Sequence, residues 1–177
     1  MNDKLLLTSF QTWLPHQKSN SSDDLLKTIQ NQAYSNLHFV RKLPVNTNLA
    51  ASRVIEAIER IEPKGIICCG MAESRSQLTV ESNAVCDRDC IFTQVNLEEL
   101  IVCSNNTKIS HDAGKFVCEG LYYQILKYIQ TNQLDTLCIF VHIPPIDSDN
   151  INIIQQDFIA ITNFLSRIDK HEPFDRI

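Results

Sequence analysis

Short apolar runs alternate along the chain with longer stretches in which apolar residues recur at helical spacing. The runs predict strands at Lys4–Ser9, Leu37–Lys42, Gly65–Cys69, Leu78–Cys86, Thr107–Ser110 and Leu134–His142, of which Gly65–Cys69 and Leu134–His142 are expected to be buried. The helical spacing predicts helices from Ser21 or Ser22 to about Gln32, from Asn46 or Thr47 to Pro63, and over Phe116–Gln130 and Ile151–Arg167. This alternation predicts an α/β fold of three layers (α/β/α), in which helices cover both faces of a mainly parallel twisted sheet.

The strand ends indicate where a site would form. In parallel sheets, ligands bind beyond the carboxyl ends of the strands. The predicted elements therefore direct attention to the residues just after Phe10, Gly70 and Val141, and to the turn before the helix at Phe116.

The composition narrows the class of protein. The 177 residues are enough for one domain over 1–177, and 44% apolar with 21% charged residues is ordinary for a soluble globular protein. The net charge is −5 and no long basic run occurs, so nucleic acid and membranes are not expected as partners. Without a signal peptide or a long apolar stretch, a cytoplasmic protein is expected.

The seven cysteines do not form an obvious pattern of their own. An odd number without a signal peptide argues against a disulfide framework, and most of them are expected to be small buried apolar residues. Cys86 and Cys90 could be half of a zinc site, but the adjacent Cys68 and Cys69 would point to opposite faces of a strand. A dinucleotide-binding glycine motif is also missing, and neither a cofactor nor a metal is expected.

Cys118 differs from the other cysteines in its setting. It follows Gly114, which permits a tight turn, and falls in the first turn of the predicted helix from Phe116. Unpaired N–H groups and the positive end of the helix dipole favour a thiolate there and can stabilise an oxyanion. Cys118 is therefore a candidate nucleophile, although the pattern alone favours packing beside Leu121 and Tyr122.

His142 and Glu81 offer the base, and the residue orienting the base, that a cysteine nucleophile needs. His142 follows the apolar run Leu137–Val141, where it could equally be a strand-end residue with one hydrogen bond. Glu81 lies in an otherwise apolar or small strand, and alternation leaves a solvent-facing position as the alternative. Strand ends and a helix start of one sheet can bring Cys118, His142 and Glu81 together as a triad.

These residues also carry a family resemblance. Gly70–Glu81 resembles the motif G-x-A-x-G-R-x-x-I-x-x-E of the pyroglutamyl peptidase I family of cysteine peptidases. Ser110–Glu119 (SHDAGKFVCE) resembles the family's nucleophile motif, and Phe140–Pro144 (FVHIP) resembles its histidine motif. Thr8–Trp13 and Leu43–Val45 match two further segments, so the resemblance covers nearly the whole chain.

The resemblance implies an enzyme that removes pyroglutamate from the N-terminus of peptides. Cys118 would attack the carbonyl, His142 would transfer the proton, and Glu81 would hold the imidazole. Five residues would line the substrate pocket, namely Phe10, Trp13, Met71, Phe116 and Val117. Aromatic faces suit a flat, uncharged lactam ring, whereas ordinary core packing is the alternative for Phe10 and Trp13.

The sequence departs from the family pattern in several places. Gly-Gly pairs of the family are replaced by Leu14-Pro15 and Glu73-Ser74. Glu119 replaces the asparagine after the nucleophile, and it would raise the pKa of the thiol if it faced the sulfur. Cys86–Asn106 is interpreted as too short for the family's hairpin and helix, with one strand or helix near Leu97–Cys103.

These departures leave two alternatives open. The chain could be an inactive, trimmed family member that acts as a binding protein, or a cysteine-dependent amidase for another small acyl group. The family uses an arginine near the oxyanion, for which Arg88 is the nearest candidate. The number of subunits does not follow from the sequence.

Overall fold

The structure is a computed structural model that describes residues 3–32 and 34–168. The outermost residues of the predicted domain therefore lie outside the described ranges. The main sheet has six strands, β1 (Leu5–Phe10), β2 (Leu37–Leu43), β3 (Gly65–Met71), β4 (Thr79–Glu81), β7 (Lys108–Ser110) and β8 (Leu137–Ile143). The helices are α1 (Ser21–Gln30), α2 (Thr47–Ile61), α3 (Leu97–Val102), α4 (Val117–Thr131) and α5 (Ile151–Arg167).

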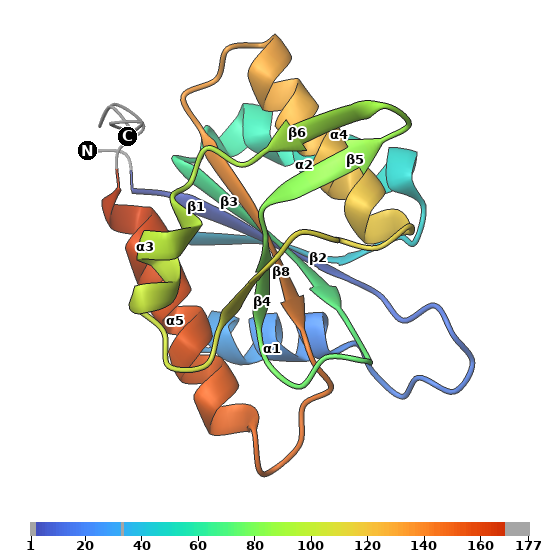
Figure 1. Ribbon diagram of the computed structural model, residues 1–177, viewed down its shortest axis with the longest axis vertical. Helices are drawn as coiled ribbons and strands as arrows, with labels where there is room; N and C mark the ends of the chain where they lie inside the picture. The colour runs from blue at the N-terminus through green and yellow to red at the C-terminus, as the bar shows by residue number, and fades with distance from the viewer. Residues whose placement is uncertain (1–2, 33, 169–177) are drawn as a thin grey trace.

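The sheet is mainly parallel, as the alternating pattern predicts. Its strand order is β2-β1-β3-β8-β4-β7 (Figure 1). The first four strands run in one direction, whereas β4 is antiparallel to β8 and parallel to β7. The carboxyl ends of β1, β3 and β8 consequently meet at one edge, where the sequence places its candidate residues.

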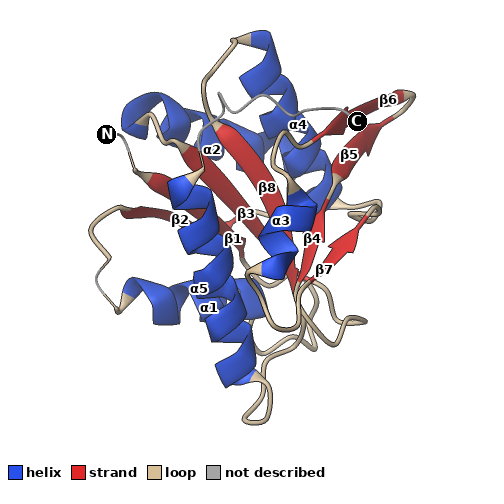
Figure 2. Ribbon diagram, turned by 60° about the vertical axis from the view of Figure 1, so that its left-hand side comes forward, coloured by secondary structure: helices blue, strands red, loops and turns tan. Residues whose placement is uncertain are grey.

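Two apolar cores separate the sheet from its helices. Side chains alternate across each strand, so neighbouring residues such as Leu5 and Leu6 enter different cores. One core lies beneath α1, α3 and α5, and the other beneath α2 and α4. Figure 2 shows helices on both faces of the sheet. The predicted three-layer α/β/α fold is confirmed.

Two element boundaries differ from the sequence-based expectations. The N-terminal cap of α1 is Asn20 rather than Ser21 or Ser22, because the Asn20 side chain accepts a hydrogen bond from the N–H group of Ser22. The predicted strand Leu78–Cys86 is two strands, since Ser82 bonds to Ser110 and Thr93 and the chain leaves the main sheet there.

The segment after Glu81 is not trimmed of its hairpin and helix. β5 (Asn83–Cys86) and β6 (Asp89–Phe92) form an antiparallel hairpin, and α3 follows it. Asp87 in the turn has a φ of 54°, the left-handed conformation that tight hairpin turns require. The interpretation of Cys86–Asn106 as too short is therefore wrong. Within the described ranges, no helix is both long and apolar enough to cross a membrane.

Candidate active site

The register of three neighbouring strands brings the candidate residues to one face of the sheet. Thr79 pairs with His142 and Glu81 with Phe140, while Gly70 pairs with His142 from the other side. Paired residues and every second residue along a strand share a face. Glu81, His142 and Gly70 therefore face α4, whose first turn carries the candidate nucleophile.

Glu81 and His142 form a buried pair. The imidazole Nδ1 lies 2.7 Å from Oε1 of Glu81, and the two residues are 5% and 0% exposed. The solvent-facing alternative for Glu81 is therefore wrong. Burial alone would raise the pKa of Glu81, but hydrogen bonds from His142 and Ser110 and the charge of Arg75 lower it below its ordinary value. The ionised carboxylate only accepts, so Nδ1 carries the hydrogen and Nε2 is left as the basic nitrogen.

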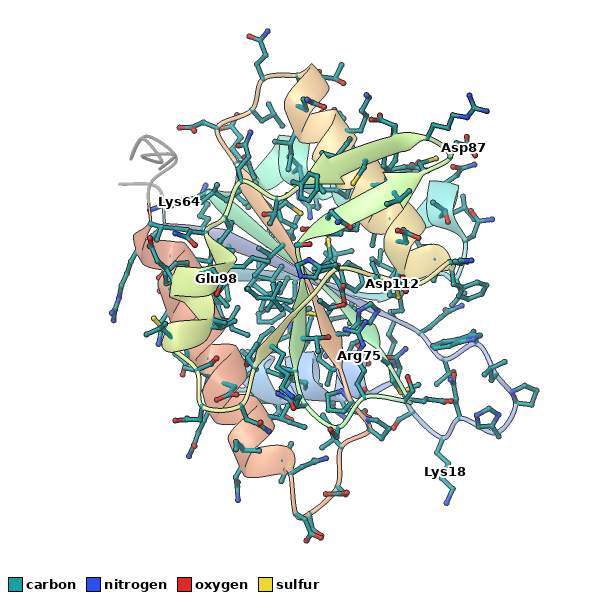
Figure 3. The ribbon with its side chains drawn as sticks, viewed as in Figure 1. Lys18, Lys64, Arg75, Asp87, Glu98 and Asp112 are labelled. Atoms are coloured by element: carbon teal, nitrogen blue, oxygen red, sulfur yellow. The ribbon has the colours of Figure 1, made fainter. Side chains whose placement is uncertain are left out.

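Arg75 is the arginine of this site. Its guanidinium donates to Oε1 of Glu81 at 2.6 Å and to the hydroxyl of Thr79. It also donates to the carbonyl of Asp112 at 2.9 Å and to the Ser110 hydroxyl at 3.2 Å. Figure 3 shows Arg75 close to Asp112, in the loop that leads to α4.

Arg88, the arginine suggested by sequence position, lies in the turn between β5 and β6. Sequence reasoning assigned no role to Arg75, although it occupies the arginine position of the motif that ends at Glu81. The motif was the signal that could have identified it. Its four bonds connect the carboxylate on β4 to the backbone ahead of the nucleophile.

Cys118 lies in the first turn of α4, as predicted. Its sulfur packs closely over Gly70, because a Cβ atom built on that glycine would lie only 2.6 Å from Sγ. Burial, together with Cys68 and Glu81, raises the pKa of the Cys118 thiol to about 12. The helix start favours the thiolate, but desolvation of the sulfur acts more strongly in the opposite direction, so the pKa of the thiol lies above its ordinary value.

A cavity of about 160 Å³ joins these parts of the site. Cys118 and His142 line it together with all five residues that the resemblance implies for the pocket, Phe10, Trp13, Met71, Phe116 and Val117. Within the part of the chain that the structure describes, no hydrogen bond joins the Cys118 sulfur to His142. Such contacts are often long before substrate binds.

Two aromatic rings form the outer wall of this cavity. The rings of Trp13 and Phe116 are tilted by 41° with centroids 6.1 Å apart, whereas Phe10 is almost fully buried beneath. Asn20 and Ala113 also line the cavity, and sequence reasoning missed both. Asn20 is 3% exposed and bonds to the Gln11 carbonyl as well as capping α1, so its cap position was the available signal.

Glu119 does not point at the nucleophile. Its carboxylate accepts a hydrogen bond of 3.1 Å from the N–H of Val85 in β5. The glutamate that replaces the family's asparagine therefore connects α4 to the hairpin. Among the described residues, no three His, Cys, Asp or Glu side chains are grouped so that they could hold a metal ion.

The sequence is similar to those of known peptidases. A family model described as pyroglutamyl peptidase matches residues 98–162, which include Cys118 and His142. The pyrrolidone-carboxylate peptidase of Oceanobacillus iheyensis is 25% identical over 80% of this chain and 83% of that protein. The pyrrolidone-carboxylate peptidase of Brachyspira hyodysenteriae is 25% identical over 89% of this chain and 93% of that protein.

Solved structures show the same fold. The pyroglutamyl peptidase I of Bacillus amyloliquefaciens superposes with a TM-score of 0.83 at 20% identity, covering 95% of this chain and 97% of that chain. The pyrrolidone carboxyl peptidase of Thermococcus litoralis superposes with a TM-score of 0.77 at 18% identity, covering 98% and 99%. The resemblance to the pyroglutamyl peptidase family is confirmed.

Proposed function

We propose that this chain, which resembles the pyroglutamyl peptidases in sequence and fold, is a cysteine peptidase that removes pyroglutamate from the N-terminus of peptides. One observation carries the proposal: Cys118 and His142 line the same aromatic cavity, and Oε1 of Glu81 lies 2.7 Å from Nδ1 of His142. A cytoplasmic location and a peptide substrate are part of this proposal.

The cavity suits an uncharged ring. Its lining is mostly apolar and aromatic, and the titratable groups on it are Cys118 and His142. The lactam ring is neutral and can be buried there at little cost. The ammonium group of an unmodified N-terminal glutamate would lose its hydration without meeting a carboxylate on the lining. The site would therefore select the cyclised residue.

Acylation begins with a protonated thiol. As the Cys118 sulfur attacks the carbonyl carbon, Nε2 of His142 removes the thiol proton. The Glu81 carboxylate, which Arg75 helps to keep ionised, stabilises the resulting imidazolium. The oxyanion would accept hydrogen bonds from the first turn of α4. The cap residue, Phe116, has no polar side-chain atom to occupy these N–H groups, and the first backbone bond at this end is donated by Gly120.

The products leave in two steps. The C–N bond breaks as His142 returns its proton to the leaving amine, which releases the shortened peptide and leaves a thioester on Cys118. Nε2 then removes a proton from a water molecule that attacks the thioester. The C–S bond breaks, the proton passes to the sulfur, and pyroglutamate leaves with the enzyme restored.

The two observations behind the inactive, trimmed alternative give it little support. The hairpin and α3 occupy the segment after Glu81, and the Glu119 carboxylate bonds to Val85. The amidase alternative differs only in the acyl group and is separated by substrate choice.

The decisive experiment measures release of a fluorescent amine from its pyroglutamyl amide. We expect turnover by the unaltered chain and loss of about 10³-fold or more in kcat for Cys118→Ala. Prolyl and acetyl amides of the same amine test the acyl group. Turnover no greater than that of Cys118→Ala would overturn the proposal, and preference for another acyl amide would favour the amidase.

A further inference from the structure

The two places where this chain replaces glycine pairs of the family lie side by side. Leu14-Pro15 belongs to the β1–α1 loop (residues 11–20), and Glu73-Ser74 belongs to the β3–β4 loop (residues 72–78). In Figure 1 the β1–α1 loop projects beyond the edge of the sheet, next to the β3–β4 loop. Hydrogen bonds through Glu73 join the two loops.

The side-chain amide of Gln17 bridges the loops. Its Oε1 accepts from the N–H groups of Trp13 at 3.0 Å and Leu14 at 3.2 Å. Its Nε2 donates to Oε1 of Glu73 at 2.9 Å, and Nε2 of His16 lies 3.4 Å from the same oxygen. The carboxylate of Glu73 is thus one side chain away from the backbone of Trp13, a wall of the pocket.

The β3–β4 loop is the fixed side of this contact. Ala72 donates to the carbonyl of Ile143 at 2.9 Å, and Arg75 donates its N–H to Ala72 at 3.1 Å. The Arg75 side chain is in turn held by Glu81 and Asp112. Glu73 therefore lies in a turn that is anchored to the triad on one side and to β8 on the other.

The β1–α1 loop is held more weakly near Trp13. The indole meets Phe116 at 6.1 Å, and Phe116 is itself 58% exposed. Among the described residues, the polar contacts that tie this part of the loop to the β3–β4 loop are those of Gln17 and His16 with Glu73. Neither Glu73 nor Gln17 lines the cavity itself.

We propose that Glu73 is a positioning residue for substrate binding, which acts through Gln17 to hold Trp13 over the pocket. The proposal rests on the proposed function for the identity of the substrate. Because Glu73 contacts no reacting group, its loss should weaken the binding of the substrate and of the transition state equally. The consequence is a higher KM with an unchanged kcat.

A pair of substitutions tests the bridge itself. Gln17→Glu keeps an oxygen that accepts from the Trp13 N–H, but its carboxylate would repel the carboxylate of Glu73. Glu73→Gln removes the negative charge of residue 73. In the double variant the new amide can donate to the new carboxylate, which restores the bond in the opposite direction. We expect KM to rise about three- to tenfold in Gln17→Glu and Glu73→Ala, and to return within about twofold in the double variant.

A second readout needs no substrate. Trp13 is the single tryptophan of the chain, so acrylamide quenching of its fluorescence reports the β1–α1 loop alone. Quenching should increase in Glu73→Ala and Gln17→Glu and return in the double variant. Glu56→Ala, which removes an exposed carboxylate on α2, is the matched control and should change neither quenching nor KM.

The outcomes separate the two proposals. Unchanged quenching in Glu73→Ala would overturn the bridge, whether or not the chain turns over a pyroglutamyl amide. Increased quenching with an unchanged KM would overturn its role in substrate binding. A fall in kcat without a change in KM would do the same. Absence of turnover in every variant would instead count against the proposed function, with the bridge still judged by fluorescence.

Discussion

Gly70 leaves space for the sulfur of Cys118. A Cβ atom on residue 70 would lie 2.6 Å from Sγ, a distance that real Cβ atoms essentially never show, and 3.0 Å from a ring carbon of Phe140, which is tighter than most real contacts. Gly70→Ala should therefore displace the sulfur from the position proposed for its attack on the substrate carbonyl. We expect kcat on a pyroglutamyl amide to fall about 10- to 100-fold, as measured in steady state per folded enzyme.

The control for this prediction lies on the same strand. A Cβ on Gly65 would meet Leu165 and Leu5 at 2.9 Å, in the core beneath α5 and far along β3 from the thiol. Gly65→Ala should lower the free energy of unfolding by about 1–3 kcal/mol and leave kcat near its normal value. A normal kcat in Gly70→Ala would show that the sulfur can reach its working position past a methyl group.

Arg75 should act on the reaction through Glu81. Its cation helps to keep the pKa of Glu81 low, so in Arg75→Ala that pKa should rise. Protonated Glu81 no longer stabilises the imidazolium of His142, and activity should be lost at a higher pH on the acid side. We expect kcat to fall about tenfold or more. The acid limb of the pH profile of kcat should move to higher pH.

Arg75→Lys separates charge from geometry. A lysine keeps the cation but not the fork that reaches Glu81 and Asp112 together, so the acid limb should stay near its normal pH while kcat remains reduced. A merely structural role would lower the amount of folded protein in both variants without moving the limb. An unmoved limb in Arg75→Ala would therefore contradict the assignment.

Asp23 is a buried carboxylate outside the site on which stability in acid should depend. It accepts bonds from Ser9 at 2.8 Å and from two nitrogens of Arg41 at 2.8 and 2.9 Å. Burial alone would raise the pKa of Asp23, but the bonds from Arg41 and Ser9 lower it below the ordinary 3.8. Its contribution is therefore complete above about pH 3.8 and is lost as pH falls through the lower folded pKa.

Asp23→Asn removes this contribution. At pH 7 we expect a loss of about 1 kcal/mol in the free energy of unfolding, because Arg41 stays partly solvated. Urea unfolding at pH 7, 5 and about 3 measures the difference, which should shrink at the lowest pH, where Asp23 itself becomes protonated. A difference that is the same at all three values would exclude the ionised pair as its cause.

The layers of the fold were predictable because the residues that each helix or strand buries recur at a regular spacing in the sequence. The predicted helix over Ile151–Arg167 has the observed bounds, and its apolar stripe faces the core. The break at Ser82 was not predictable, since residues on both sides have strand-like composition. It comes from bonds to Ser110 and Thr93, which are remote in sequence.

The sequence indicated which residues belong to the candidate site, but not how they contact one another. Alternation alone assigns Glu81 to a face but does not say whether that face is covered. Pairing of β4 with β8, and the position of α4 above them, bury it beside His142. The contacts of Arg75 with Asp112 and of Gly70 with Cys118 join segments more than 30 residues apart. The periodic pattern of apolar and polar residues carries no trace of such contacts.

The Cys118 thiol should react slowly until substrate binds. Its pKa of about 12 leaves almost no thiolate at neutral pH, whereas Cys86, Cys90 and Cys103 are exposed. Alkylation with iodoacetamide at pH 8, followed by mass spectrometry of each cysteine, should label these three before Cys118. Labelling of Cys118 should rise with pH up to at least 10 and should not level off near pH 7. A plateau below pH 7 would instead reveal a thiolate already paired with His142, so that attack would begin with the proton transferred.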